Sequence, residues 1–403
     1  MTESRLAGRG LVLLGIAVLA FNLRPAAVSV GPVLDEIRDG LDMSGTEAGI
    51  LTALPVVAFA VFGALTPRFG ALVGPHRLTL IALVGVVVGL YGRSRAEDVP
   101  SFLALSLLAL AGMAAGNVML PSLVRRHFPG RVGLVTGVYT AALAVGLTSA
   151  SVLTVPVGDQ YDEWRSGLAV WAVTAAIAAL PWLVLVRHDR RIDHAAAADT
   201  SVVGLRQVGR TRVGRLMAVY FALQSLQAYA IFGWFAAVYR DAGFSDTTSG
   251  VLLGVVTGVS MPLSFVVPAL AGRLTDLKPL VVALFVCYPI GYLGLIIAPA
   301  GGAWLWAVVI GCGTATFPLI LVLIGLRSRT PNGTAALSGF TQSVGYLAAA
   351  VGPFGVGVVH DATGGWTLPL LVLLVLSLPL LPVGLALSRQ QYVEDELVTA
   401  RES

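Results

Sequence analysis

Long runs of apolar residues, separated by short polar segments, dominate the chain. A run of about 20 apolar residues is long enough to cross the hydrocarbon core of a bilayer as one helix. The runs do not alternate apolar and polar positions as half-buried strands would. The pattern predicts an all-α integral membrane protein with twelve transmembrane helices. The expected spans are residues 11–34, 46–66, 77–92, 100–123, 132–156, 166–187, 215–239, 247–270, 279–298, 303–326, 334–358 and 366–387.

Composition supports this prediction. Of the 403 residues, 56% are hydrophobic and 12% are charged, whereas about 25% of a soluble domain is charged. The net charge of +4 comes from basic residues in short loops between spans, so it does not indicate a nucleic-acid partner. The partner that the composition predicts is the lipid bilayer.

The basic residues also predict an orientation. If both termini are cytoplasmic, 20 of the 26 Lys and Arg residues lie on the cytoplasmic side and five on the other. Cytoplasmic loops are enriched in Lys and Arg, so we expect both termini inside. The longest loop, 188–214, is polar and Arg-rich, and it separates a six-helix half at 1–187 from a second at 215–390. We expect the acidic tail at 391–403 to be cytoplasmic and disordered.

The two halves are related repeats. When the first half is shifted by 202 positions, "RRHFPGRVGLVTG" aligns with "RSRTPNGTAALSG". Five distinctive positions coincide: Arg125 with Arg327, Pro129 with Pro331, Gly137 with Gly339, Asp159 with Asp361 and Trp164 with Trp366. Parallel six-helix repeats are a transporter architecture in which substrate binds near the midplane between the halves.

Three stretches carry a family resemblance: "FNLRPAAVSVGPVL", "LQSLQAYAIFGW" and "LSGFTQSVGYLAAAVGPFGVGVVHDATGGW". With these the chain resembles the cyanate/nitroimidazole permease (CynX/NimT) branch of the major facilitator superfamily. The resemblance implies twelve helices in a bacterial inner membrane. It also implies alternating access for a small solute, typically a small anion or a nitroheterocycle, but it does not fix which one.

The loop between spans 2 and 3 departs from this family. The superfamily motif there is G-x-x-x-D-R/K-x-G-R-R/K, and this chain has "GALTPRFGALVGPHR", with Pro67 in place of the Asp. The motif positions that remain are Gly63, Arg68 and Gly70. The gating ion pair of that Asp is therefore not expected, and Arg273 and Asp276 of "AGRLTD" are the candidates to replace it.

Arg24 is the strongest candidate for a functional residue. It is the only cation well inside an expected span, and no Asp, Glu or His lies at comparable depth. A charge in the membrane is costly and is a functional candidate by default. The planar guanidinium suits small anions and nitro or carbonyl oxygens. The alternative is a structural role, because Pro25 lacks an N–H and leaves the Phe21 carbonyl without its helical partner.

Polar side chains recur on single helix faces elsewhere. Gln224 and Gln227 share one face of span 7, and Gln342 and Tyr346 share one face of span 11. Hydrogen bonding between helices is the alternative for each amide. Asn22 lies about 200° around its helix from Arg24, so both cannot face one cavity squarely. The candidate substrate contacts are Arg24, Asn22, Asn117, Tyr139, Gln224, Gln227, Gln342 and Tyr346.

Several glycines fit close approach and sliding of helices. They are Gly133, Gly137, Gly146, Gly339, Gly345 and Gly352.

These observations predict a secondary active or facilitative transporter of a small anionic or polar solute. The alternative within transport is an efflux pump for drugs or nitroheterocycles, and the alternative from another class is a passive anion channel. The sequence has no phosphate-binding loop, no His/Cys/carboxylate cluster at metal spacing and no serine with a buried histidine base. We therefore expect no enzyme activity, no ATP use, no metal or other cofactor, and a monomer.

Overall fold

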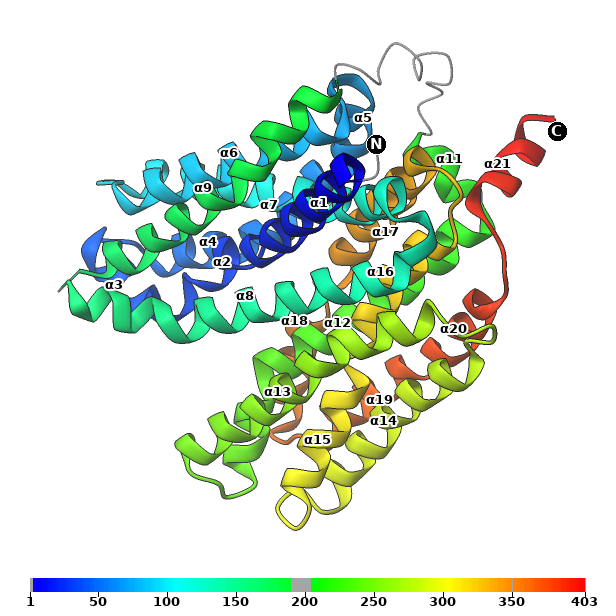
Figure 1. The fold of residues 1–403 in the computed structure, drawn as a ribbon. Helices are drawn as coiled ribbons and strands as arrows, with labels where there is room; N and C mark the ends of the chain where they lie inside the picture. The colour runs from blue at the N-terminus through cyan, green and yellow to red at the C-terminus, as the bar shows by residue number, and fades with distance from the viewer. Residues whose placement is uncertain (1–2, 162, 190–203, 350, 403) are drawn as a thin grey trace. The chain divides into compact units, whose positions relative to one another are not determined.

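The computed structural model describes residues 3–161, 163–189, 204–349 and 351–402, and these are almost entirely helical (Figure 1). Twelve segments among them are long and apolar enough to cross a membrane, which confirms the expected number. The principal helices are α1 (Glu3–Asn22), α2 (Pro25–Val28), α3 (Leu34–Gly40), α4 (Gly45–Ala58), α5 (Ala64–Val73), α6 (Pro75–Ser94), α7 (Val99–His127), α8 (Val132–Gln160), α9 (Trp164–Asp189), α11 (Leu205–Arg210), α12 (Arg212–Asp241), α13 (Asp246–Ala271), α14 (Lys278–Ile297), α15 (Ala303–Gly313), α16 (Thr316–Leu326), α17 (Pro331–Ala349), α18 (Val351–Thr363), α19 (Thr367–Ser377), α20 (Leu380–Ser388) and α21 (Val393–Glu402).

The chain forms two compact units. Unit 1 comprises Met1–Gly130, Val138–Leu205 and Thr330–Gly339, and unit 2 comprises Arg131–Gly137, Arg206–Arg329 and Phe340–Ser403. The first residues of α8 thus pack within unit 2, and the first residues of α17 pack within unit 1. The expected halves at 1–187 and 215–390 did not include this exchange. Most of the expected central loop lies outside the described residues, between the end of α9 and the start of α11.

Each unit is a helical bundle with its own core. In unit 1, α6 packs along α7 and α9, and α1 packs on α7 and α9. Trp182 of α9 is buried against Gly15 of α1. In unit 2, α15 packs along α13 and α14, and α12 contacts α13, α18 and α20. The candidate substrate contacts considered below lie on α1, α7 and α8 and at the start of α2 in unit 1, and on α12 and α17 in unit 2.

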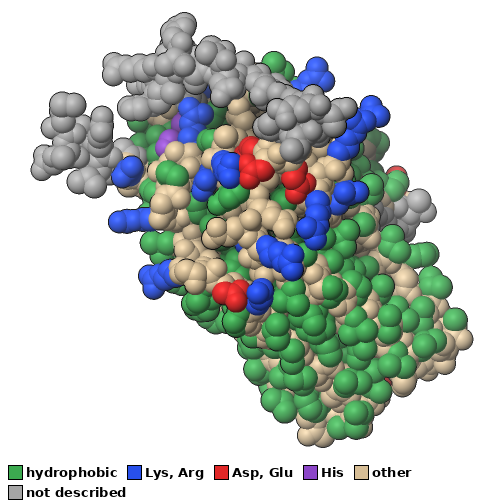
Figure 2. All heavy atoms as spheres, turned by 90° about the vertical axis from the view of Figure 1, so that its right-hand side faces the viewer, with side chains coloured by type: hydrophobic (Ala, Val, Ile, Leu, Met, Phe, Trp, Pro, Cys, Tyr) green, Lys and Arg blue, Asp and Glu red, His purple; other side chains and the backbone are tan. Residues whose placement is uncertain are grey.

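Large apolar side chains point outward from both units. Leu72 and Val152 of unit 1 and Ile297 and Phe354 of unit 2 are each at least 60% exposed. Figure 2 shows a face on which hydrophobic side chains form a broad area, while Lys and Arg side chains gather at one end. An apolar patch of this extent would be a liability in water. It is the surface that lipid covers in a membrane protein.

The six glycines expected at close helix contacts all lie at such contacts. A Cβ added at any of Gly133, Gly137, Gly146, Gly339, Gly345 or Gly352 would come within 3 Å of a neighbouring atom. At Gly133 that atom is the Cα of Gly272 on the end of α13, at 2.5 Å. The predicted close approach is confirmed at these positions, and sliding at them stays a prediction.

The expectation of a disordered tail is wrong. Residues 393–402 form α21, and its acidic first turn binds other parts of unit 2. The carboxylate of Asp395 accepts two hydrogen bonds from the Arg329 guanidinium, at 2.5 and 3.0 Å. Glu394 accepts from the Arg329 backbone N–H at 2.9 Å. Glu396 accepts from the backbone N–H of Arg212, at the start of α12.

Arg327 completes the connection between the tail and the bundle. Its carbonyl accepts the Val393 N–H at 3.0 Å, and its guanidinium donates to the carbonyls of Leu387 and Ser388 at the end of α20. Those carbonyls are among the orphan acceptors that every helix end leaves. The acidic composition suggested solvation, whereas the carboxylates instead cap α12 and bind a neighbouring arginine.

Charge reversal at Arg329 tests whether the tail is docked in solution. We expect Arg329→Glu to speed hydrogen exchange at the backbone amides of residues 393–397 roughly three- to fivefold, because an exposed ion pair contributes up to about 1 kcal/mol. The double variant Arg329→Glu with Asp395→Arg should restore slow exchange. Arg273→Glu, at another exposed arginine of unit 2, is the control. Fast exchange in the wild-type tail would contradict docking.

Candidate functional site

The first membrane-spanning segment is broken near its middle. Helix α1 ends at Asn22, a turn follows, and α2 begins at Pro25 within the span Arg9–Val33. Proline has no N–H for the helical hydrogen bond and is accommodated at the first position of a helix. Arg24 therefore stands at the N-cap of α2, half-buried, in the interior of a membrane span.

The break is covered by the backbone of α8. A Cβ added at Gly146 would lie 2.0 Å from the carbonyl oxygen of Phe21, so only glycine fits there. Phe21 is the residue whose carbonyl loses its partner at Pro25. On the other side, Gly116 of α7 lies against the Leu23 side chain. The break is thus held between two helices of unit 1.

Asn22 is engaged in helix packing. Its amide nitrogen donates to the Val18 carbonyl at 2.9 Å, and its amide oxygen accepts from the Thr174 hydroxyl of α9 at 2.7 Å. Both polar ends of the side chain are used within unit 1. This geometry favours the helix-packing alternative over substrate contact.

The two other candidates of unit 1 lie on helices that flank the break. Asn117 follows Gly116 on α7 and is buried. Tyr139 lies near the start of α8 and is also buried. A role for Asn117 and Tyr139 in substrate binding stays a prediction.

Gln227 of unit 2 is likewise bonded between helices. Its amide nitrogen donates to the Leu373 carbonyl of α19 at 2.9 Å, and its amide oxygen accepts from the Tyr292 hydroxyl of α14. The predicted face of α12 is buried, but at Gln227 it points into unit 2. Tyr220 on the same face contacts Gly384 of α20.

Gln224 differs from Gln227 in one respect. Its amide nitrogen donates to the Ser225 hydroxyl at 2.5 Å and to the Phe221 carbonyl at 3.2 Å. Its amide oxygen is buried and accepts no hydrogen bond from the described residues. A buried acceptor without a donor is costly, so Gln224 retains capacity for a ligand or water.

Aromatic rings gather where α12 meets α17. The Phe221 ring lies 4.8 Å from Tyr346 in an edge-to-face arrangement and 6.2 Å from Phe317 of α16. Tyr229, one-third exposed, lies 6.2 Å from Tyr346. Gln342 is buried one helical turn before Tyr346. The aromatic cluster comprises Phe221, Tyr229, Phe317 and Tyr346, and of these only Tyr346 was among the candidate substrate contacts predicted from the sequence.

The motif after span 2 makes an apolar contact where the family has a carboxylate. A Cβ added at Gly339 of α17 would lie 2.5 Å from Pro67 Cγ and 3.2 Å from the Gly63 carbonyl. Gly63 ends a π-helical stretch, Phe59–Gly63, and Arg68 on α5 is exposed. At the position where the family motif has its Asp, Pro67 thus packs against the backbone of Gly339.

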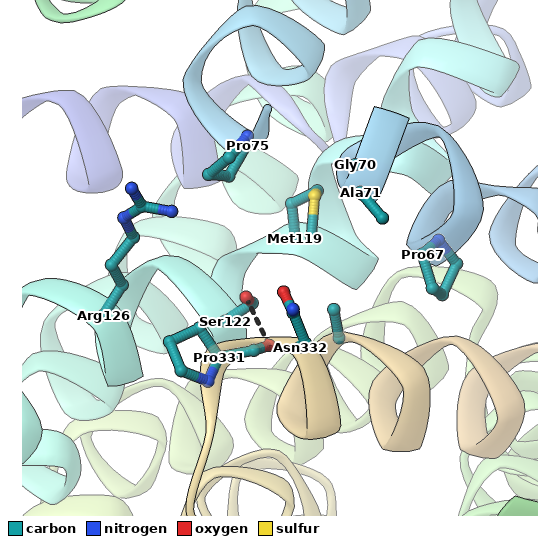
Figure 3. Close-up of a pocket in the computed structure, with 10 residues that line it drawn as sticks. Pro67, Gly70, Ala71, Pro75, Met119, Ser122, Arg126, Pro331 and Asn332 are labelled. Atoms are coloured by element: carbon teal, nitrogen blue, oxygen red, sulfur yellow. Dashed lines mark hydrogen bonds between the residues drawn. The ribbon is translucent and has the colours of Figure 1, made fainter. Parts of the chain in front are cut away.

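A pocket beside this contact holds about 420 Å³ of empty space, part of it open to solvent (Figure 3). Gly70 and Met119 form one wall, and the Ser122 hydroxyl donates to the Pro331 carbonyl at 2.8 Å across its floor. The Asn332 side chain points into the pocket and Arg126 borders it. It lies at the start of α17, far along the chain from Arg24.

The proposed replacement pair is not formed among the described residues. Arg273 and Asp276 are both exposed after α13, and no ion pair between them is present there. Asp276 instead accepts the Lys278 N–H at 3.0 Å and caps α14. A gating role for this pair has no support in this geometry.

Arg93 is the functional candidate that the sequence did not reveal. The expected span 77–92 left it in a loop, but it lies inside α6 and is 0% exposed. Arg24 is therefore not the only cation within a span. The sequence contained a signal for this position, since "VVVGLYGRS" continues a helical apolar pattern through Arg93. Because Arg93 lies near the end of the expected span, however, exposure of its side chain to solvent was the favoured interpretation.

The comparisons with known proteins agree with this architecture. A family model described as Major Facilitator Superfamily matches residues 11–353. The 2-nitroimidazole transporter of Escherichia coli (strain K12) is 30% identical over 97% of this chain and 99% of its own. The cyanate transport protein CynX of the same organism is 30% identical over 88% and 91%. The solved proton:xylose symporter XylE has a TM-score of 0.73 at 13% identity, covering 98% of both chains.

The chain is a membrane transporter of the Major Facilitator Superfamily and belongs to its cyanate/nitroimidazole permease branch. The likeness to XylE, at this identity, bears on the fold alone.

Replacing Gln227 tests its structural assignment. Gln227→Leu removes two hydrogen bonds and deprives the buried Tyr292 hydroxyl and Leu373 carbonyl of this partner. We expect the free energy of unfolding to fall by about 1–2 kcal/mol. Thermal unfolding of the purified protein measures this. Gln224→Leu, one turn away, should cost less, because both bonds of Gln224 stay within α12 and its amide oxygen accepts none from the described residues. Unchanged stability of Gln227→Leu would contradict the assignment.

Proposed function

We propose that this transporter moves a small anionic or strongly polar solute by alternating access, with Arg24 as its primary contact. The observation that carries the proposal is the helix break that holds a half-buried guanidinium inside a membrane span. A cation kept there at a cost of several kcal/mol is expected to have a function. Its planar donors match small anions and nitro or carbonyl oxygens.

The names of the relatives support a solute of this size. One relative is named for 2-nitroimidazole and one for cyanate. The first is a small heterocycle with nitro oxygens, and the second is a linear anion of three heavy atoms. A guanidinium can donate to either, so Arg24 fits both solutes.

Other side chains would supply the remaining contacts. The unbonded amide oxygen of Gln224 can accept from a ring N–H, and Gln342 and Tyr346 offer polar groups on α17. The aromatic cluster offers ring faces and edges, which suit a heteroaromatic solute. Asn117 and Tyr139 remain candidates in unit 1. The side-chain amides of Asn22 and Gln227 form hydrogen bonds between helices instead.

The orientation and setting follow from charge and family. Basic residues cluster on the side of the termini, so we propose that both termini are cytoplasmic, in a bacterial plasma membrane. We propose a monomer, since each superfamily chain carries both repeats and completes a pathway alone.

Efflux of neutral nitroheterocycles is the second candidate. The aromatic cluster favours it, because ring stacking adds affinity for a flat heterocycle and little for a linear anion. The two candidates differ in the charge that moves. In proteoliposomes an anion carrier without compensating ions generates current, and an exporter of neutral solute does not. Unitary channel currents would instead indicate the passive anion channel.

Ligand-induced stabilisation tests the role of Arg24 directly. A ligand that binds only the folded state stabilises it by RT ln(1 + [L]/Kd), so weak ligands register at high concentration. We expect cyanate or 2-nitroimidazole to raise the Tm of the wild type and Arg24→Leu to lose that rise. Arg95→Leu, at an exposed arginine of unit 1, should keep it. If folded Arg24→Leu shows the full rise, Arg24 is structural and the proposed contact is wrong.

A further inference from the structure

Arg93 connects the end of α6 to the break in the first span. One guanidinium nitrogen, Nη1, donates to the Ala26 carbonyl at 2.8 Å, and Nη2 donates to the Ser29 hydroxyl at 2.8 Å. The Ser29 hydroxyl in turn donates to the Pro25 carbonyl at 2.5 Å. One buried cation thus binds α2 through the carbonyl of its second residue and through the hydroxyl of the residue that follows the helix.

The chemistry of the break explains why a donor is needed there. In a continuous helix the Ala26 carbonyl would accept from the Val30 N–H, but α2 ends at Val28 and that bond is absent. An unsatisfied carbonyl in the apolar part of a membrane costs several kcal/mol. The Arg93 guanidinium satisfies it from a neighbouring helix.

No carboxylate among the described residues forms an ion pair with Arg93. A cation buried without an anion is costly, so the bonds to α2 are what its burial depends on. It is also sealed off, with no exposed surface through which a solute could reach it. These observations argue for a role through α2 rather than contact with the solute.

Helix α2 in turn fixes the backbone of Arg24. The Arg24 carbonyl accepts from the N–H groups of Ala27 and Val28, both at 3.1 Å. Arg24 is therefore the first residue of the same turn whose far end Arg93 holds. A shift of α2 would move the Cα of Arg24 and therefore the position of its guanidinium.

We propose that Arg93 is a positioning residue: its bonds to Ala26 and Ser29 hold α2 and so set the geometry at which Arg24 meets the solute. This inference rests on the proposed role of Arg24. Displacing a binding group by about 1 Å can cost a large factor in activity, so a residue that never touches the solute can still decide affinity.

Arg93→Lys is the main test, because it keeps the charge and removes the fork that spans both acceptors. We expect the Kd for cyanate or 2-nitroimidazole, whichever stabilises the wild type, to weaken about tenfold, as for loss of one charged hydrogen bond. Amide exchange at residues 27–29 should also become faster. Arg165→Lys is the matched control, since Arg165 donates to the Ser94 and Ala96 carbonyls at the same end of α6.

A double-mutant cycle separates positioning from general destabilisation. If Arg93 acts through Arg24, then Arg93→Lys added to Arg24→Lys should weaken affinity little further, because the two changes are coupled. Fully additive losses would overturn the proposal. Faster exchange in α2 with unchanged affinity would also overturn it, since Arg93 would then only stabilise the fold.

Two further outcomes remain informative. If Arg93→Lys does not fold, Ser29→Ala removes the Nη2 contact together with the hydroxyl's own bond to the Pro25 carbonyl and keeps the Nη1 bond to Ala26. It should weaken affinity in the same direction by a smaller factor, and an unchanged Kd there overturns the proposal. If neither probe stabilises the wild type, the proposed function fails. Amide hydrogen exchange at residues 27–29 then tests only whether Arg93 holds α2 in place. Faster exchange in Arg93→Lys supports this part of the proposal, and unchanged exchange overturns it.

Discussion

The demand that backbone polar groups be satisfied away from water governs this structure. Lipid offers no hydrogen bonds, so any interruption of a membrane helix must be repaired by protein groups. The first span is interrupted at Pro25, and the Arg93 guanidinium donates a hydrogen bond to the Ala26 carbonyl beyond the break. The Gly146 backbone packs closely over the Phe21 carbonyl. The interruption is what turns Arg24 into the N-cap of a new helix, so the candidate site exists only because the break is repaired.

The same demand explains the amides that do not face a solute. Asn22 links α1 to α9 in unit 1, and Gln227 links α12 to α19 in unit 2. In both repeats the amide ties the first helix of the bundle to its sixth span. A membrane helix has little hydrophobic drive to associate in lipid, and interhelical hydrogen bonds contribute to its packing. The two halves thus use the same kind of bond between the same pair of spans, although the offset of 202 aligns Asn22 with Gln224 rather than with Gln227. The helix break and Arg93 belong to the first half alone.

Much of the fold was predictable because span length and hydropathy depend on the bilayer rather than on tertiary detail. The number of spans, the repeat and the glycine contacts all follow from such local patterns. The neighbours of the polar helix face on α12 could not be predicted in this way. Helical periodicity places Gln224 and Gln227 on one face, but it does not show which helix that face contacts. Arg93 was missed for a related reason: its burial depends on orphan carbonyls of another helix. The order of the tail was not predicted, because composition cannot show that its carboxylates bind Arg329 and the start of α12.

The replacement of a carboxylate by Pro67 has a physical consequence for how α17 is held. An ion pair tolerates changes of angle and of a few tenths of an ångström, since its attraction falls slowly with distance. Contact between the Pro67 ring and Gly339 tolerates less separation, because a gap of about 0.5–1 Å already removes about a quarter to a half of the van der Waals attraction. The start of α17 is held in unit 1 by this apolar packing together with the hydrogen bond from the Ser122 hydroxyl to the Pro331 carbonyl. A contact of this kind either forms fully or separates, and salt does not weaken it as it weakens an exposed ion pair. At the other end of the same connection, Arg329 is bound to the tail by exposed charges that salt does screen. The short segment between Arg329 and Gly339 thus begins at an ion pair that salt screens and ends at an apolar contact that salt does not screen.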